Sequence, residues 1–148
     1  METPDLWLQF GYAGLFALSF CAATLVPLGS EAAVGIMAAS GFSPAWVFVV
    51  ATAGNSLGAV VNYYVGLYGA DCILSRWVRV DTGALARAGN IFSRWGSPVL
   101  FFAWLPVVGD PLTVAAGVLR VRLAVFCAWV VAGKALRYAV IVGAVAGV

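Results

Sequence analysis

The hydrophobic positions of this 148-residue chain fall into long runs with few charged residues. Leu6 to Val26 is a run of 21 residues with three polar interruptions. As a helix, such a run is long enough to cross a hydrocarbon core of about 30 Å. Residues 45–70 and 123–148 form two further runs of spanning length, the second of them carrying two bases. The pattern therefore predicts helices that cross a membrane.

Two shorter apolar segments, 27–41 and 106–117, are interrupted by proline and glycine. Proline lacks an amide hydrogen and restricts the residue before it, so a helix should break at these points. Irregular backbone at membrane depth is tolerated only where protein buries it or where it lines a water-filled cavity. We therefore expect each segment to form a re-entrant helical hairpin, and for the first segment a helix with an unwound entry is the alternative. The predicted hairpin-breaking residues are Pro27, Gly29, Pro106, Gly109 and Pro111.

The two broken segments are copies of one pattern. Glu31 and Asp110 each follow a proline by four residues, and they lie 79 residues apart. The same offset aligns Gly54 with Gly133. Broken helices at matching positions of two halves are typical of transporters built from inverted repeats. We predict an all-α integral membrane protein, an inverted repeat of two re-entrant helical hairpins plus transmembrane helices. It should form a single membrane domain, 1–148, with repeat 1 at about 6–70, a linker at 71–94 and repeat 2 at about 95–148.

Composition supports the membrane class. The chain is 64% hydrophobic and 9% charged, whereas soluble domains have about 25% charged residues. The net charge of +2 and the lack of a dense basic run argue against a nucleic-acid partner. The chain has no histidine and three scattered cysteines, so neither a metal site nor a cofactor is predicted.

The arginines predict an orientation. Residues 71–94 hold four arginines, and none occurs before residue 76. The positive-inside rule places this segment in the cytoplasm, and part of it is expected to form an amphipathic surface helix. The uncharged Ser43-Pro44 turn then falls on the other side. The acidic residues Glu2 and Asp5 argue against a signal peptide at the start of the first run.

Four ionisable residues lie within apolar segments: Glu31, Asp110, Lys134 and Arg137. Four unpaired charges at the bilayer centre would cost on the order of 10 kcal/mol, so we expect them to pair, neutralise or face water. Lys134 and Arg137 are three residues apart and share a helix face. The 79-residue offset aligns Lys134 with Asn55, which predicts a polar core between the halves. The predicted proton- or substrate-binding residues are Glu31, Asp110, Lys134, Arg137, Asn55 and Arg120.

The acids have a structural interpretation too. Asp110 followed by Pro111 fits an N-cap with proline at the first helical position. Ser30-Glu31 could open a helix whose dipole favours the acid. An acid that caps a helix at the midplane can also carry a proton, so the two interpretations stay open together.

Several of these motifs, in this order and spacing, are similar to those of a known family. They are Pro27–Glu31 with Gly41-Phe42, Gly54–Gly58 with Tyr63–Gly66, Trp104–Thr113 with Ala116-Gly117, and Gly133–Tyr138. The chain resembles DedA family membrane proteins, also called VTT or SNARE-associated domain proteins, over about residues 10 to 140. The YqaA-like branch is the most similar. The resemblance implies inverted hairpins and a functional role for Glu31. Asp110 stands where better-known members carry arginines, which bears on whether the substrate is a polyprenyl phosphate.

The resemblance also implies a function and a location. We expect a non-enzymatic lipid flippase or scramblase of the bacterial inner membrane that moves phospholipid or polyprenyl phosphate and is linked to protons. The alternatives are a proton-coupled transporter of a small solute or ion, and a structural membrane protein. An intramembrane protease is disfavoured, since the chain lacks histidine for a serine triad and Val107 departs from the GxGD pattern. The oligomeric state stays open, with a homo-oligomer as one option.

Overall fold

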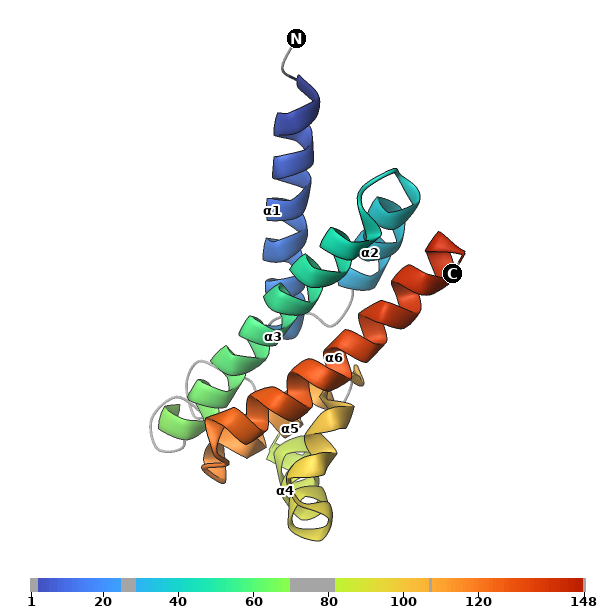
Figure 1. The fold of residues 1–148 in the computed structure, drawn as a ribbon. Coiled ribbons are helices and arrows are strands. Elements are labelled where there is room, and N and C mark those ends of the chain that lie inside the picture. The colour runs from blue at the N-terminus through green and yellow to red at the C-terminus, as the bar shows by residue number, and fades with distance from the viewer. Residues whose placement is uncertain (1–2, 25–28, 70–81, 107, 148) are drawn as a thin grey trace. The chain divides into compact units, whose positions relative to one another are not determined.

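The computed structural model describes residues 3–24, 29–69, 82–106 and 108–147, and every regular element among them is a helix (Figure 1). The elements are α1 (Thr3–Thr24), α2 (Ser30–Ala39), α3 (Pro44–Gly69), α4 (Thr82–Trp95), the 3-10 helix η1 (Ser97–Trp104), α5 (Gly109–Val118) and α6 (Leu123–Ala146). The α3 and α6 helices are long and apolar enough to cross a membrane. The all-α class and these two spanning helices agree with the sequence prediction.

The helices recur at the 79-residue offset. The α2 and α5 helices have ten residues each and begin 79 residues apart, and the same offset separates the starts of α1 and α4 and of α3 and α6. Backbone hydrogen bonds outside the helix ladders recur as well. The matched bonds run from Ala33 to Gly29 and Leu112 to Val108, from Phe42 to Met37 and Val121 to Ala116, and from Val47 to Ser43 and Phe126 to Arg122. The duplication thus extends to local structure, while re-entrance and inversion stay predictions.

A turn separates α4 from the apolar residues that follow it. The chain turns at Gly96 and then forms η1. Gly96 has φ +68°, a conformation that side-chain-bearing residues rarely adopt. Pro98 has no amide hydrogen to bond a carbonyl of the preceding turn. These two residues together end α4 and start a separate 3-10 helix.

The described chain forms two compact units, each drawn from both halves of the sequence. The first comprises Met1–Gly58 and Ala135–Val148. Its buried core contains Leu15, Val34, Val47, Ala51, Tyr138 and Val142. Within it, α1 and α3 approach closely at Gly54 and Gly58 of α3. A Cβ atom at either glycine would lie only 2.6 Å from a carbonyl oxygen of α1.

The second unit is Ala59–Lys134. Its core gathers buried side chains of α3, α4, η1, α5 and α6, and the largest of these are Tyr63, Phe92, Leu100, Leu112 and Phe126. The Tyr63 hydroxyl donates a hydrogen bond of 2.6 Å to the carbonyl of Val121, which ties α3 to the turn before α6. This division into units does not test the prediction of a single membrane domain, which stays a prediction.

The α4 helix is the amphipathic helix expected within 71–94. Ala88 and Phe92 are buried in the core of the second unit, whereas Arg87 and Arg94 are exposed. Residues 70–81, which include the other two arginines of the predicted linker, lie outside the described residues.

Candidate functional site: paired charges at two interrupted helices

Both predicted acids occupy the second position of a ten-residue helix. Glu31 lies in the first turn of α2 and Asp110 in the first turn of α5. The N-cap residues are Gly29 and Val108, and neither helix start has a capping hydrogen bond from a side chain. The interpretation of Asp110 as an N-cap is therefore wrong, because α5 begins at Gly109 and already includes Asp110. Both acids still complement the positive end of a helix dipole.

Glu31 forms an ion pair with Arg137 in the first unit. Nη2 of Arg137 donates a hydrogen bond to Oε1 of Glu31. The two partners differ in exposure, since the Arg137 side chain is 12% exposed and the Glu31 side chain 47%. The Glu31 carboxylate is therefore accessible to groups from outside the protein, whereas the Arg137 guanidinium is largely buried. Loss of the Glu31 carboxylate would therefore remove an ion pair from a largely buried guanidinium, which destabilises a protein.

A second bond lies beside this ion pair. The Tyr138 hydroxyl donates to Oγ of Ser30 at 3.0 Å, and both side chains are buried. Two consecutive residues of α2 thus bind two consecutive residues of α6. Sequence reasoning did not assign this role to Ser30 or Tyr138. The available signal was that each flanks a predicted ionisable residue within an apolar segment.

Asp110 interacts electrostatically with Lys134 in the second unit. Lys134 lies within α6 and is 3% exposed, whereas Asp110 is partly buried. The Thr113 hydroxyl bonds the main-chain oxygen of Asp110 at 2.8 Å, so its acceptor is not the carboxylate. Each acid thus faces a different base of α6, and the two bases are less than one helical turn apart along it.

The other two predicted binding residues have structural surroundings of their own. Nδ2 of Asn55 donates a hydrogen bond of 2.9 Å to the carbonyl of Ser19, joining α3 to α1. Arg120 is exposed in the turn after α5, whose axis extends about 12 Å from Asp110 to Val118. Its φ is +53°, at the position where the first half has Gly41 with φ +86°. The structure does not bring Arg120 to Asp110, and a binding role for Asn55 or Arg120 stays a prediction.

The predicted hairpin-breaking residues lie at the starts of α2 and α5, except Pro27, which is outside the described residues. Gly29 has φ +129° immediately before α2. Pro106 lies in the turn after η1, and the amide of Gly109 closes that turn with a 2.8 Å bond to Leu105. Pro111 is the third residue of α5, where its missing amide hydrogen costs no helical bond.

Three buried hydroxyls of the first unit escaped sequence reasoning. Oγ of Ser19, Oγ1 of Thr52 and Oγ of Ser56 are buried, with no hydrogen-bond partner among the described residues. Thr52 and Ser56 are four residues apart on one face of α3. That spacing was the signal in the sequence for a polar face on α3. Serine and threonine are common in apolar helices, so the spacing alone does not indicate a functional role.

Comparison with known proteins assigns the family. The VTT domain matches residues 26–147, which include α2, α3, α4, η1, α5 and α6. The chain belongs to the VTT domain family, also called the DedA family. It is 40% identical over 131 residues to inner membrane protein YqaA of Escherichia coli, with 88% of this chain and 87% of the relative covered. YqaA of Shigella flexneri gives the same figures.

A more distant relative comes from Haemophilus influenzae. This uncharacterized protein is 30% identical over 147 residues, which cover 92% of this chain and 88% of the relative. No solved structure matches this VTT domain protein significantly. The family, the inner-membrane relatives and the two spanning helices identify it as a protein of the bacterial inner membrane. Its family is linked in general to membrane transport.

Proposed function

We propose that this VTT domain protein is a lipid flippase or scramblase that moves phospholipid or polyprenyl phosphate across the inner membrane and is linked to protons. It carries out no covalent chemistry in this proposal. The observation that carries the proposal is that the acid at each interrupted helix interacts with a base of α6. Glu31 pairs with Arg137, and Asp110 interacts with Lys134.

Exchange of partners gives these pairs a transport role. A charge within a membrane needs a partner, so a lipid headgroup can enter only by replacing one of the existing partners. The half-exposed carboxylate of Glu31 is the accessible partner of its pair, while Arg137 stays largely enclosed. A phosphate that approaches could take the place of Glu31 on Arg137, and the displaced carboxylate could then bind a proton or a cationic headgroup.

This chemistry favours some lipids over others. Arginine binds phosphate in a bidentate manner, whereas lysine binds it as a point charge. A zwitterionic phospholipid offers a phosphate to the base and an amine to the acid of either pair. A polyprenyl phosphate offers only the anion, so the acids would have to be protonated for it to bind. The proposal therefore predicts proton dependence for the anionic substrate above all.

The test is lipid movement in reconstituted vesicles, measured with labelled phospholipid and labelled polyprenyl phosphate. Glu31→Gln and Asp110→Asn should insert and fold, yet their rates should fall to those of protein-free vesicles. Loss of one partner of a buried pair destabilises by about 3–5 kcal/mol, so the melting temperature is measured for every variant. Arg122→Gln is the matched control, because it removes an exposed charge from the turn before α6.

Neutral double variants separate transport from structure. Glu31→Gln with Arg137→Gln and Asp110→Asn with Lys134→Met leave no unpaired charge, so stability should recover while lipid movement stays absent. Movement at the parent rate in both stable doubles would favour the alternative, a structural membrane protein in which the charges only hold the hairpins. Proton-coupled uptake of a small solute without lipid movement would instead favour the other alternative, a solute or ion transporter.

A further inference from the structure

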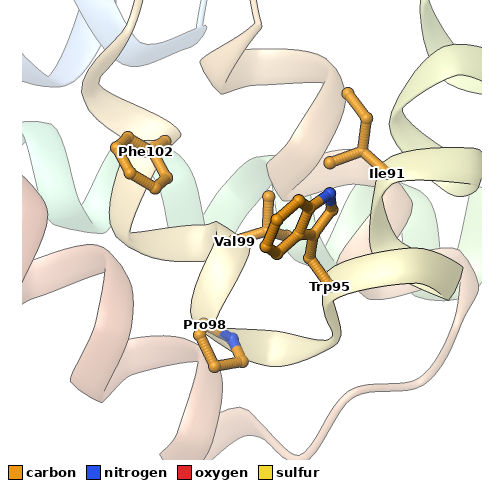
Figure 2. A pocket seen from close by; sticks show the side chains of 5 residues that line it. All are labelled: Ile91, Trp95, Pro98, Val99 and Phe102. Atoms are coloured by element: carbon orange, nitrogen blue, oxygen red, sulfur yellow. The ribbon is translucent and has the colours of Figure 1, made fainter.

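An apolar pocket lies beside the amphipathic helix, and none of the four paired charges lines it. It has a volume of about 370 Å³ and is lined by Ile91, Trp95, Pro98, Val99 and Phe102. Figure 2 shows these side chains around it, with two from the end of α4 and three from η1. Trp95 is 71% exposed and Phe102 49% exposed, so the pocket opens at the surface of the second unit. The volume is within the range of small-molecule sites.

The pocket lies between two different faces of α4. Successive residues of a helix are rotated by about 100° around its axis. This rotation puts the buried Ala88 and Phe92 on one face and the exposed Arg87 and Arg94 on a second face, about 120° around the axis. Ile91 lies between them. The pocket therefore occupies the border between the apolar core face and a cationic stripe, made by two arginines seven residues apart with no acid in α4.

A second, smaller hollow lies next to this border. It has a volume of about 120 Å³, shares Ile91 with the apolar pocket and has Arg87 in its lining. Val108 and Pro111, on either side of Asp110 in the sequence, line it as well. Apolar lining and the guanidinium group of Arg87 thus follow one another along α4, and Arg94 lies on the same face as Arg87. This order of groups matches an amphiphile with a hydrocarbon chain and an anionic head, since an uncharged apolar ligand would gain nothing from the arginines.

We propose that the α4–η1 pocket is a binding site for an anionic phospholipid of the surrounding bilayer, with one acyl chain against Val99 and Phe102 and the phosphate at Arg87 and Arg94. An exposed tryptophan at the mouth suits a membrane interface, where an amphipathic ring contacts both chain and headgroup. The lining of the apolar pocket contains none of Glu31, Asp110, Lys134 and Arg137, so the proposal goes beyond the proposed transport function. It would retain lipid at the protein whether or not lipid crosses the membrane.

The test uses the full chain in lipid nanodiscs and needs no transport. Lipids brominated on the acyl chain quench a nearby tryptophan, and the difference between the parent and Trp95→Phe isolates the signal of Trp95. We compare brominated phosphatidylglycerol with brominated phosphatidylcholine at equal low fractions. The association should favour the anionic lipid by roughly fivefold for each arginine, the ratio that about 1 kcal/mol gives. Arg87→Gln with Arg94→Gln should remove this preference.

Two controls make the outcome decisive. Arg122→Gln removes an equally exposed arginine outside α4 and should keep the preference. Equal quenching by the two lipids in the parent would overturn the proposal and leave an apolar surface in contact with hydrocarbon. A preference that survives the double arginine variant, or that is lost in Arg122→Gln, would overturn it as well. A lipid-movement assay on the same variants tests the transport proposal separately, because the quenching experiment measures lipid binding alone.

Discussion

At the scale of single residues, the bond between Tyr138 and Ser30 should determine how firmly α2 is held. Tyr138→Phe removes the donor and leaves the Ser30 hydroxyl buried without it. Hydrogen bonds between helices in membranes contribute about 0.6 kcal/mol on average and up to about 1.7. Because both groups are buried, we expect a loss near 1 kcal/mol in the free energy of unfolding, measured by denaturation in detergent micelles.

The matched variant is Ser30→Ala, and the double variant completes a thermodynamic cycle. If the bond is the whole effect, Ser30→Ala should cost nothing further once Tyr138→Phe is present. Additive losses would show that the two side chains act independently and that α2 is held by other contacts.

Arg120 offers a stability prediction at the position where the first half has glycine. A non-glycine residue in the left-handed region costs about 1–2 kcal/mol, whereas glycine loses about 0.5–1 kcal/mol of chain entropy. Arg120→Gly should therefore stabilise the protein by about 0.5–1 kcal/mol in a thermal or chemical melt. Arg122→Gly, two residues on, lacks this conformation and should not stabilise it. Stabilisation together with lost lipid movement would support a binding role for the Arg120 side chain.

At the scale of elements, the close approach of α3 and α5 rests on two glycines. A Cβ atom at Gly117 would collide with the carbonyl of Tyr63, and one at Gly66 with the carbonyl of Val114. Both obstacles are backbone, which cannot rotate away. Gly117→Ala should therefore destabilise the second unit by about 1–3 kcal/mol or more.

Gly89→Ala is the control for this prediction. It lies inside α4, and a Cβ atom there meets nothing within 4 Å. Alanine in a helix interior is favoured over glycine by about 0.5–1 kcal/mol, so Gly89→Ala should raise the melting temperature. Equal effects of the two substitutions would show that the α3–α5 approach does not limit stability.

The elements also show what the sequence could predict. Apolar run length predicted α1, α3 and α6, because that signal is local. Proline and glycine positions predicted where the chain is interrupted. A helical hairpin was expected at each interruption, but the described residues of each broken segment form one ten-residue helix, α2 or α5. The break at Gly96 was not predicted, although Gly96 and Pro98 are local signals for it. The partners of the charges could not be predicted. The Glu31–Arg137 pair joins residues 106 apart in the chain, and only the packing of distant helices selects Arg137 over Lys134.

At the scale of the whole molecule, the two halves share helix positions but not chemistry. The offset places Gly109 where the first half has Ser30, and Ala59 where the second half has Tyr138. The hydroxyl pair therefore occurs in one unit only, and both bases belong to α6. Such divergence is compatible with a transporter whose halves take different parts in one cycle. The convergence of Glu31 and Asp110 near the midplane stays a prediction.

The duplication makes a prediction about topology that single-cysteine labelling can test. If both broken segments re-enter the membrane and the halves are inverted, Gly83→Cys and Arg122→Cys should react from the cytoplasmic side, and Ser43→Cys from the opposite side. All three positions are exposed. The hydrogen bonds of residues 43 and 122 use main-chain atoms, so cysteine keeps them.

The measurement uses a membrane-impermeant maleimide on intact cells and on inverted vesicles, in a background where Cys21, Cys72 and Cys127 are alanine. The ten residues of α2 or α5 span about 15 Å, half of a hydrocarbon core, so neither helix can cross the core alone. Labelling of positions 43 and 83 from the same side would contradict inversion. Because the acids lie at the starts of these short helices, that result would also remove the reason for placing Glu31 and Asp110 at a shared depth.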